Sequence, residues 1–153
     1  MNKFMEVAFE EARKGMHGNE GGPFGAVVVK NGEIISRAHN EVLLHNDPTN
    51  HAEVLAIRRA SSVLENFDLT GCEIYSTSYP CPMCLASILW AHIDKIYYGT
   101  SSEEVEKVGF DDSLIYQKLC NKHQLASAIK PIDSEDCREL LLEWDKKEDK
   151  KTY

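Results

Sequence analysis

Strand-like and helix-like segments alternate along the first hundred residues, and this alternation limits the folds open to the chain. Two β-rich runs, 24–29 and 33–36, flank Asn31-Gly32, a dipeptide typical of a tight hairpin. Two later strand-like runs, 72–76 and 95–99, each follow a helix-like segment. Strands joined through helices imply right-handed crossovers and a partly parallel sheet. We therefore expect an α/β fold, a three-layer sandwich of a mixed sheet with helices on both faces.

The expected helices have apolar residues at helical spacing with polar residues between them. The first begins near Phe4, and Gly15 and Gly18 would end it. The others are expected at 51–64, 83–91, 101–108, 113–119 and 137–144. With 153 residues, 42% of them apolar, the chain is long enough for one domain with its own core.

Charge and cysteine content exclude several classes of protein. The net charge of −8 would repel a polyanion, so we expect no nucleic acid partner. The apolar runs are far shorter than the roughly 18 residues of a membrane span, so we expect no membrane association either. The N-terminal segment carries charges unlike a secretory signal, and five cysteines do not form complete pairs. These features predict a cytoplasmic protein with reduced thiols.

Two short motifs carry the residues expected to do chemistry: His51-Ala52-Glu53 and Pro80-Cys81-Pro82-Met83-Cys84. Two cysteines three residues apart at a helix start can present both sulfurs to one ion. A catalytic zinc ion takes three protein ligands and leaves a fourth position open, and His51 is the natural third ligand. Residues two apart on a helix do not face each other. His51 and Glu53 can therefore share a site only if the helix starts there and the site is approached from its end.

Each motif also has a simpler interpretation. Asn50 followed by Glu53 resembles a capping box, which would make Glu53 a helix-cap residue. Cys81 and Cys84 alone could form a redox pair. A structural zinc module is a third alternative, but it would need a fourth protein ligand, for which Cys72 is the candidate. The two motifs together favour a hydrolytic zinc site, because H-x-E with P-C-x-x-C is the signature of zinc deaminases.

The chain resembles the cytidine/deoxycytidylate deaminase superfamily, and within it the small bacterial guanine deaminases. This resemblance implies zinc-dependent hydrolytic deamination of a free purine base, most simply guanine to xanthine and ammonia, with one zinc ion per subunit. By the same resemblance, the protein would be a zinc-dependent aminohydrolase. The residues that carry the resemblance are 21–30, 46–49, 51–54, 80–84 and 109–116.

The resemblance also implies roles for individual residues. Zinc would be held by His51, Cys81 and Cys84, while Glu53 would move a proton to the purine ring and then to the departing ammonia. Asp112 would be a second acid that faces the amine. The residues expected to bind the base are Asn40, Phe24, Ala52, Trp90 and Tyr153.

The same resemblance implies a homodimer whose C-terminal segments are exchanged. Residues 1–153 would then form one deaminase domain, with a segment from about 137 to 153 packing on the partner subunit. One position departs from the guanine deaminases, which carry Glu where this chain has Tyr79. The alternatives are therefore a deaminase of another nucleobase, a nucleoside or an aminotriazine. A tRNA adenosine deaminase shares the zinc motif, but the negative net charge argues against it.

Overall fold

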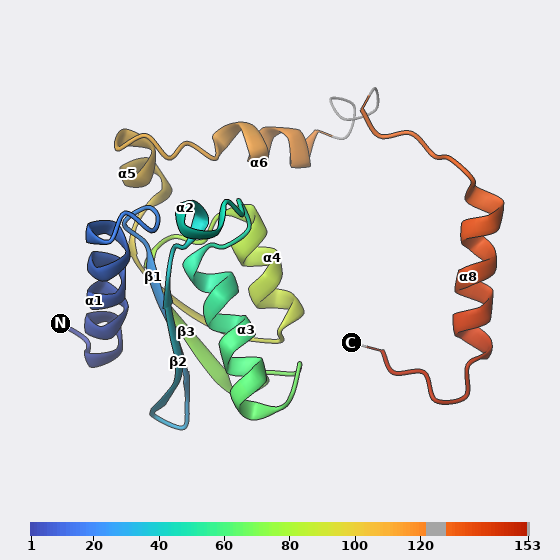
Figure 1. Ribbon diagram of the computed structural model, residues 1–153, viewed down its shortest axis with the longest axis horizontal. Coiled ribbons are helices and arrows are strands. Elements are labelled where there is room, and N and C mark those ends of the chain that lie inside the picture. Colours follow the sequence, from blue (N-terminus) through green and yellow to red (C-terminus); the bar gives the residue numbers. More distant parts are fainter. Residues whose placement is uncertain (122–127, 153) are drawn as a thin grey trace. The chain divides into compact units, whose positions relative to one another are not determined.

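The computed structural model describes residues 1–121 and 128–152 of the chain (Figure 1). The chain divides into two units, Met1–Asp112 and Ser113–Tyr153. Every residue expected to act in the zinc site, apart from Tyr153, belongs to the first unit. Tyr153 itself lies outside the described residues.

The first unit is built on a four-stranded sheet with the strand order β2-β1-β3-β4. Strand β1 pairs antiparallel with β2 and with β3, whereas β3 and β4 pair in parallel. The strands are β1 (Gly25–Lys30), β2 (Glu33–His39), β3 (Cys72–Ser78) and β4 (Lys95–Thr100). This is the mixed, partly parallel sheet predicted from the alternation of elements.

The hairpin between β1 and β2 forms where the sequence predicts it. Asn31 and Gly32 both have positive φ, 52° and 79°, as a two-residue hairpin turn of the primed type requires. Asparagine and glycine are the residues that adopt this conformation at least cost. The hairpin also sets β2 so that its last residue, His39, lies opposite Gly25, the first residue of β1.

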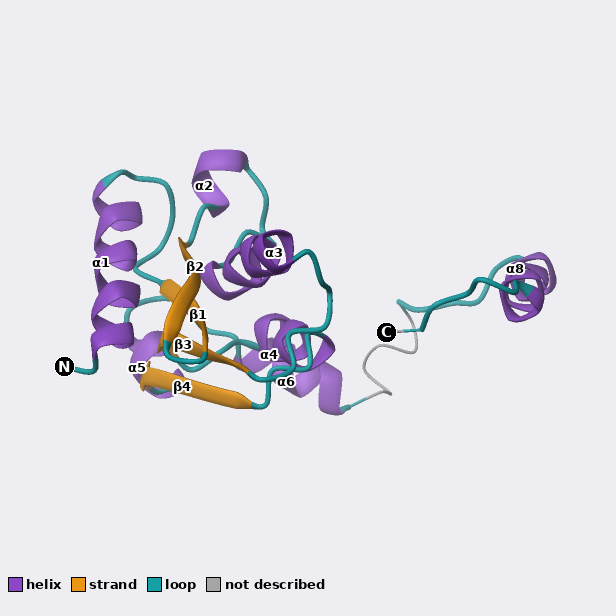
Figure 2. Ribbon diagram, turned by 90° about the horizontal axis from the view of Figure 1, so that it is seen from below, coloured by secondary structure: helices purple, strands orange, loops and turns teal. Residues whose placement is uncertain are grey.

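Helices cover both faces of the sheet, which confirms the three-layer sandwich (Figure 2). Helix α1 (Lys3–His17) packs on one face, where Val27 and Val29 are buried. Helices α3 (Ala52–Leu64) and α4 (Pro82–Trp90) pack on the other face, against side chains that include Ala26 and Val28. Because alternate residues of β1 point to opposite faces, this one strand contributes to both cores.

One local prediction needs correction. Gly18 is the C-cap residue of α1, as expected, but Gly15 lies inside the helix, which continues to His17. A Cβ at Gly15 would lie 2.4 Å from Cδ2 of His39, so glycine is needed here for close packing rather than for a helix end. The structure also has a short helix, α2 (Val42–His45), for which the sequence pattern gave no expectation.

The remaining helices agree with the sequence pattern within a few residues. Helix α5 (Ser102–Lys107) completes the first unit, and its N-cap Ser101 forms a capping box with Glu104. The second unit contains α6 (Ser113–Cys120) and α8 (Ser134–Lys146). In the part of the chain that the structure describes, none of the helices has the length and apolar character needed to cross a bilayer.

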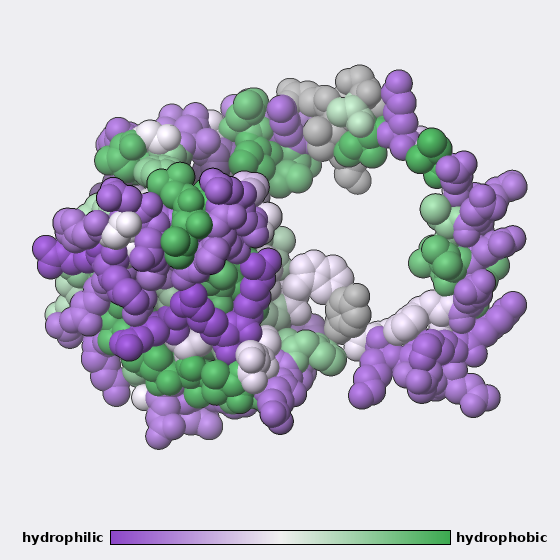
Figure 3. Space-filling model, in the orientation of Figure 1, coloured by the Kyte–Doolittle hydropathy of each residue, from purple (hydrophilic) through white to green (hydrophobic). Residues whose placement is uncertain are grey.

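Helix α8 is amphipathic and leaves its apolar side chains exposed. Leu140, Leu141 and Leu142 are 64%, 69% and 52% exposed, and Trp144 is 44% exposed. Figure 3 shows apolar residues on this helix beside strongly hydrophilic ones. Apolar groups exposed in this number are typical of a surface that another element covers.

Candidate active site

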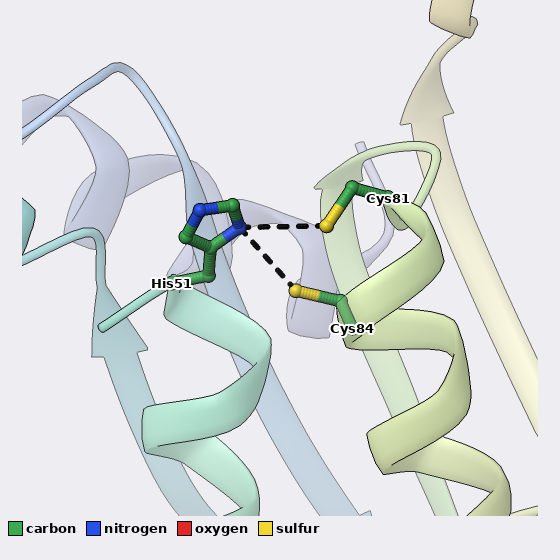
Figure 4. A group of neighbouring side chains, drawn as sticks. All are labelled: His51, Cys81 and Cys84. Atoms are coloured by element: carbon green, nitrogen blue, oxygen red, sulfur yellow. Dashed lines mark hydrogen bonds between the residues drawn. The ribbon is translucent and has the colours of Figure 1, made fainter. Parts of the chain in front are cut away.

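Two helices present their N-termini at one place in the first unit. His51 is the N-cap residue of α3, and Cys81 is the N-cap residue of α4. Neither side chain caps its own helix, so both are available to bind something else. Helices α3 and α4 lie side by side, and their first turns carry His51, Cys81 and Cys84 toward one another (Figure 4). The positive ends of two helix dipoles therefore favour anionic groups here.

The distances among these three side chains fit a tetrahedral zinc ion. Nδ1 of His51 lies 3.6 Å from Sγ of Cys81 and 3.5 Å from Sγ of Cys84. Zinc bonds of about 2.3 Å to sulfur and about 2.0 Å to nitrogen, at a tetrahedral angle, would separate N and S by about 3.6 Å. The donor set and its spacing thus suit zinc, with one coordination position left for a non-protein ligand.

The two cysteines have opposite shifts in acidity. The hydrogen bond from Cys84 is the main cause that lowers the pKa of the Cys81 thiol, and His51 adds to it. The same hydrogen bond, together with burial and the nearby Glu53, raises the pKa of Cys84. The opposite shifts favour the thiolate at Cys81 and keep the proton on Cys84. A divalent cation would release that proton, because metal ligation requires both sulfurs as thiolates.

Glu53 lies against this group from the second residue of α3. Glu53 is only 6% exposed, and burial is the main cause that raises the pKa of its carboxyl. Oε2 accepts a hydrogen bond from Sγ of Cys84 at 3.4 Å, and Oε1 accepts one from Oγ of Ser76 at 3.1 Å. His51 and Glu53 thus share one site at the start of a helix, as their spacing demands.

The capping interpretation of Glu53 is wrong. The N-cap residue of α3 is His51 rather than Asn50, so Glu53 is one position too early for a capping box. The Oδ1 atom of Asn50 instead accepts a hydrogen bond from Nη1 of Arg58 at 3.1 Å. The carboxyl of Glu53 is therefore not part of a capping box.

The structural-zinc alternative loses its candidate fourth ligand. Across residues 1–121 and 128–152, the group that can hold a metal consists of His51, Cys81 and Cys84. Cys72 is buried at the first residue of β3, whereas Cys81 comes three residues after the end of that strand, so the length of β3 lies between them. Three protein donors with one position open are the arrangement of a catalytic zinc site.

The other residues expected in the site lie at differing places. Asn40 and Ala52 are buried, with Ala52 directly after His51. Phe24 is half-buried and meets the ring of Phe110 edge-on at 4.9 Å. Burial is the main cause that raises the pKa of the Asp112 carboxyl, and the charge on the sulfur of Cys81 adds to it.

Two aromatic residues, Trp90 and Tyr79, are partly exposed to solvent. Trp90 is the last residue of α4 and is 65% exposed, whereas Cys81 and Cys84 lie at the opposite end of that helix. Tyr79 is 39% exposed and packs edge-on against Tyr98 of β4, with ring centroids 5.0 Å apart.

One contact of the site was not foreseen from the sequence. Ser76 holds an oxygen of Glu53 although it lies 23 residues further along the chain. A usable signal was present, because Ser76 is a polar residue on the same strand face as the buried Ile74. A buried hydroxyl needs a partner, and here that partner is the carboxyl of Glu53.

Comparisons with known proteins agree with this geometry. Residues 1–100 match the model of the cytidine and deoxycytidylate deaminase zinc-binding region. The guanine deaminase of Bacillus subtilis (strain 168) is 45% identical over 116 residues, which are 76% of this chain and 74% of that protein. The tRNA-specific adenosine deaminase of Aquifex aeolicus (strain VF5) is 38% identical over 144 residues, 94% of this chain and 93% of that protein.

Solved structures give the same grouping. The X-ray structure of guanine deaminase from Bacillus subtilis superposes with a TM-score of 0.92 at 37% identity, covering 100% of this chain and 99% of that one. The guanine deaminase of Nitrosomonas europaea gives a TM-score of 0.67 at 28% identity, covering 71% of this chain and 63% of that one. With its family match, its relatives and a His-Cys-Cys group that can hold zinc, the chain belongs to the cytidine and deoxycytidylate deaminase family and is a zinc-dependent deaminase.

Proposed function

We propose that the protein deaminates a free purine base, converting guanine to xanthine and ammonia. The observation that carries this proposal is the buried carboxyl of Glu53 beside three metal donors that leave one coordination position open. The guanine deaminase from Bacillus subtilis, similar along the whole chain, supports guanine as the substrate.

The residues of the site divide the chemical work as follows. Zinc held by His51, Cys81 and Cys84 would supply a Lewis acid that makes water a stronger acid near neutral pH. Hydrolysis forms a C2–O bond and breaks the C2–N bond of guanine, so protons must reach the ring and then the departing amine. Glu53 carries these protons, because burial raises the pKa of its carboxyl toward the range in which a group both takes and gives a proton. Ser76 holds one carboxyl oxygen and so fixes the direction of the other.

Asn40 is oriented to donate a hydrogen bond to the base. Its Oδ1 atom already accepts from the backbone N–H of Val42 at 3.2 Å and of Gly22 at 3.4 Å. The amide nitrogen is thereby left to donate to an acceptor on the purine. Phe24 would pack on the ring, and Asp112 would face the amine. The roles of Ala52, Trp90 and Tyr153 stay predictions from the family resemblance.

The substrate is tested by measuring ammonia release from a panel of bases and nucleosides. Zinc-loaded protein is incubated separately with guanine, guanosine, adenine, cytosine, cytidine and an aminotriazine. We expect turnover of guanine, with the Glu53→Gln protein as the blank. Turnover of a different member alone would refute guanine while keeping the zinc chemistry, and Tyr79 would then be the first residue to exchange for Glu.

A tRNA adenosine deaminase is the second candidate, because the Aquifex aeolicus enzyme of that name matches 94% of this chain. Against it stands the net charge of −8, since RNA binding depends on basic side chains that neutralise phosphates. Adding tRNA to the same panel separates the two candidates. We expect no inosine in the recovered tRNA.

We also propose that the protein is a homodimer in which the segment from about 137 to 153 packs on the partner subunit. The exposed Leu140, Leu141, Leu142 and Trp144 of α8 support this proposal, because they need a covering surface. Light scattering during size-exclusion chromatography should give twice the 17.3 kDa of one chain. A mass of one chain at micromolar concentration would contradict the proposal.

The cytoplasmic location expected from the sequence stays a prediction. All five cysteines are free thiols, which suits a reducing compartment. Fractionation of the producing cells would test it, and recovery outside the cytoplasmic fraction would refute it.

A further inference from the structure

His39, the last residue of β2, is buried between carboxylates from different parts of the first unit. Its Nδ1 atom lies 3.0 Å from Oε2 of Glu11 on α1. Its Nε2 atom lies 2.5 Å from Oε2 of Glu20, which belongs to the loop after α1, and 3.9 Å from Oε1 of Glu41. The side chain of His39 is only 5% exposed. The ring thus joins the end of β2 to α1 and to the loop that follows α1.

Two arginines lie beside the carboxylates that face His39. Basic side chains balance the remaining charge: Arg37 pairs with Glu11 at 3.3 Å, and Arg59 pairs with Glu41 at 2.5 Å. A buried ionic group of this kind is often worth little as net stability but fixes one arrangement of its neighbours.

The backbone around His39 and Asn40 is shaped to receive these two side chains. A Cβ on Gly15 would lie 2.4 Å from the His39 ring. A Cβ on Gly21 would lie 2.1 Å from Oδ1 of Asn40 and 2.2 Å from its backbone oxygen. Two glycines therefore form a slot in which the imidazole and the neighbouring amide fit closely.

Glu20 links the His39 ring to two segments beside Asn40: the loop that contains Gly21 and Gly22, and the start of α2. Its backbone oxygen accepts hydrogen bonds from the N–H groups of Leu43 and Leu44 at 2.9 and 3.0 Å, so it holds the start of α2. Along the chain, Glu20 is followed by Gly21 and by Gly22, whose N–H donates to Oδ1 of Asn40. The short contact from His39 to Glu20 therefore bears on the loop and on α2 together.

The orientation of the Asn40 amide depends on that loop and on α2. The loop supplies the N–H of Gly22 and α2 supplies the N–H of Val42, and both donate to Oδ1. The backbone N–H of Asn40 donates to the oxygen of Phe24 at 3.0 Å. If the loop and the start of α2 moved apart, Oδ1 would lose these donors and the amide could rotate. Its N–H₂ group would then no longer face the base.

We propose that His39 is a positioning residue for base binding: by holding Glu11 and Glu20, it keeps the loop and α2 in place and so fixes the amide of Asn40. The inference rests on the proposed role of Asn40 as a donor to the purine. His39 touches neither the metal donors nor Glu53 among the contacts of the described residues, so it acts on binding of the base and not on proton transfer.

A double-mutant cycle with His39→Gln and Asn40→Ala tests this inference. In His39→Gln, KM for guanine should rise about tenfold, as expected for loss of one oriented hydrogen bond, while kcat changes less than about threefold. In the Asn40→Ala background the same His39→Gln change should alter kcat/KM less than about twofold, because the group through which His39 acts is gone. Multiplication of the two single effects in the double variant would overturn the proposal.

Further variants separate positioning from folding. Glu20→Gln keeps the shape of the side chain and removes the charge that faces His39, so it should also raise KM with little change in kcat. His92→Asn is the matched control, because His92 forms a half-exposed ion pair with Asp68 at 3.3 Å on another part of the surface. It should leave both kinetic constants unchanged. Zinc content and melting temperature are recorded for every variant.

A readout independent of turnover keeps this inference distinct from the proposed function. In nitrogen-15 NMR spectra, the Asn40 side-chain amide is identified by its loss in Asn40→Ala. Its signal should shift or broaden in His39→Gln and stay in place in His92→Asn; an unmoved signal in His39→Gln would refute the positioning role. Failure of the wild type to deaminate guanine would count against the proposed substrate, and the kinetic cycle would then use the base that is turned over.

Discussion

In the Glu53→Gln protein, deamination of guanine is expected to be about 10³-fold slower or worse, with zinc still bound at one ion per chain. The loss is in the range found when a general acid–base group is removed. Glutamine keeps the size of the side chain and can still accept from Ser76, but it cannot take up and release a proton. The measurement is kcat for guanine together with the zinc content of the purified protein.

Glu73→Gln is the matched control for this change. Glu73 lies on the same strand as Ser76, but its carboxylate faces Lys95 at 2.9 Å and is partly exposed. Its replacement should leave kcat within about twofold, because an exposed ion pair contributes little. If Glu53→Gln kept more than a tenth of the wild-type kcat, Glu53 would not be the proton carrier, and Asp112 would be the next carboxyl to replace.

The sheet and its helices could be predicted because local patterns determine them. Asn31-Gly32 requires little beyond its own backbone preferences to form a hairpin, and the structure has the turn at that place. The mixed sheet follows from the order of strands and helices, since a parallel pair such as β3 and β4 needs a crossover. The His51 and Cys81 motifs were recognisable for a similar reason, because each is compact in sequence.

The contacts that were missed join residues far apart in the chain. Ser76 meets Glu53 across 23 positions, and His39 meets Glu11 across 28. No periodicity or spacing within one element encodes such a pair. Gly15 illustrates the same limit, because a glycine near a helix end has the pattern of a terminator, whereas its actual function is to admit the ring of His39. The capping interpretation of Glu53 failed because the helix begins one residue later than the pattern suggested.

In the Cys84→Ala protein, zinc is expected to be absent after dialysis, and guanine deamination is expected to be undetectable. Cys84 is fully buried, and its sulfur lies 3.5 Å from Nδ1 of His51, so the substitution removes one of three protein donors. Loss of a mere supporting contact to a ligand already costs about 10- to 100-fold in metal affinity, and loss of the ligand itself should cost more. Zinc per chain and kcat are the quantities to measure.

The thermal stability of the same variant separates loss of the metal from damage to the core. A ligand that binds only the folded state stabilises it by RT ln(1 + [L]/Kd) and so raises the melting temperature, and added zinc should therefore stabilise the apo wild type. Cys84→Ala should melt at a temperature that zinc does not change, and Cys137→Ala, which replaces an exposed thiol on α8, should respond as the wild type does. A zinc response that survived in Cys84→Ala would mean that the ion binds elsewhere. Because Glu53→Gln should keep this response while losing turnover, the two variants together separate the group that carries protons from the groups that hold the metal.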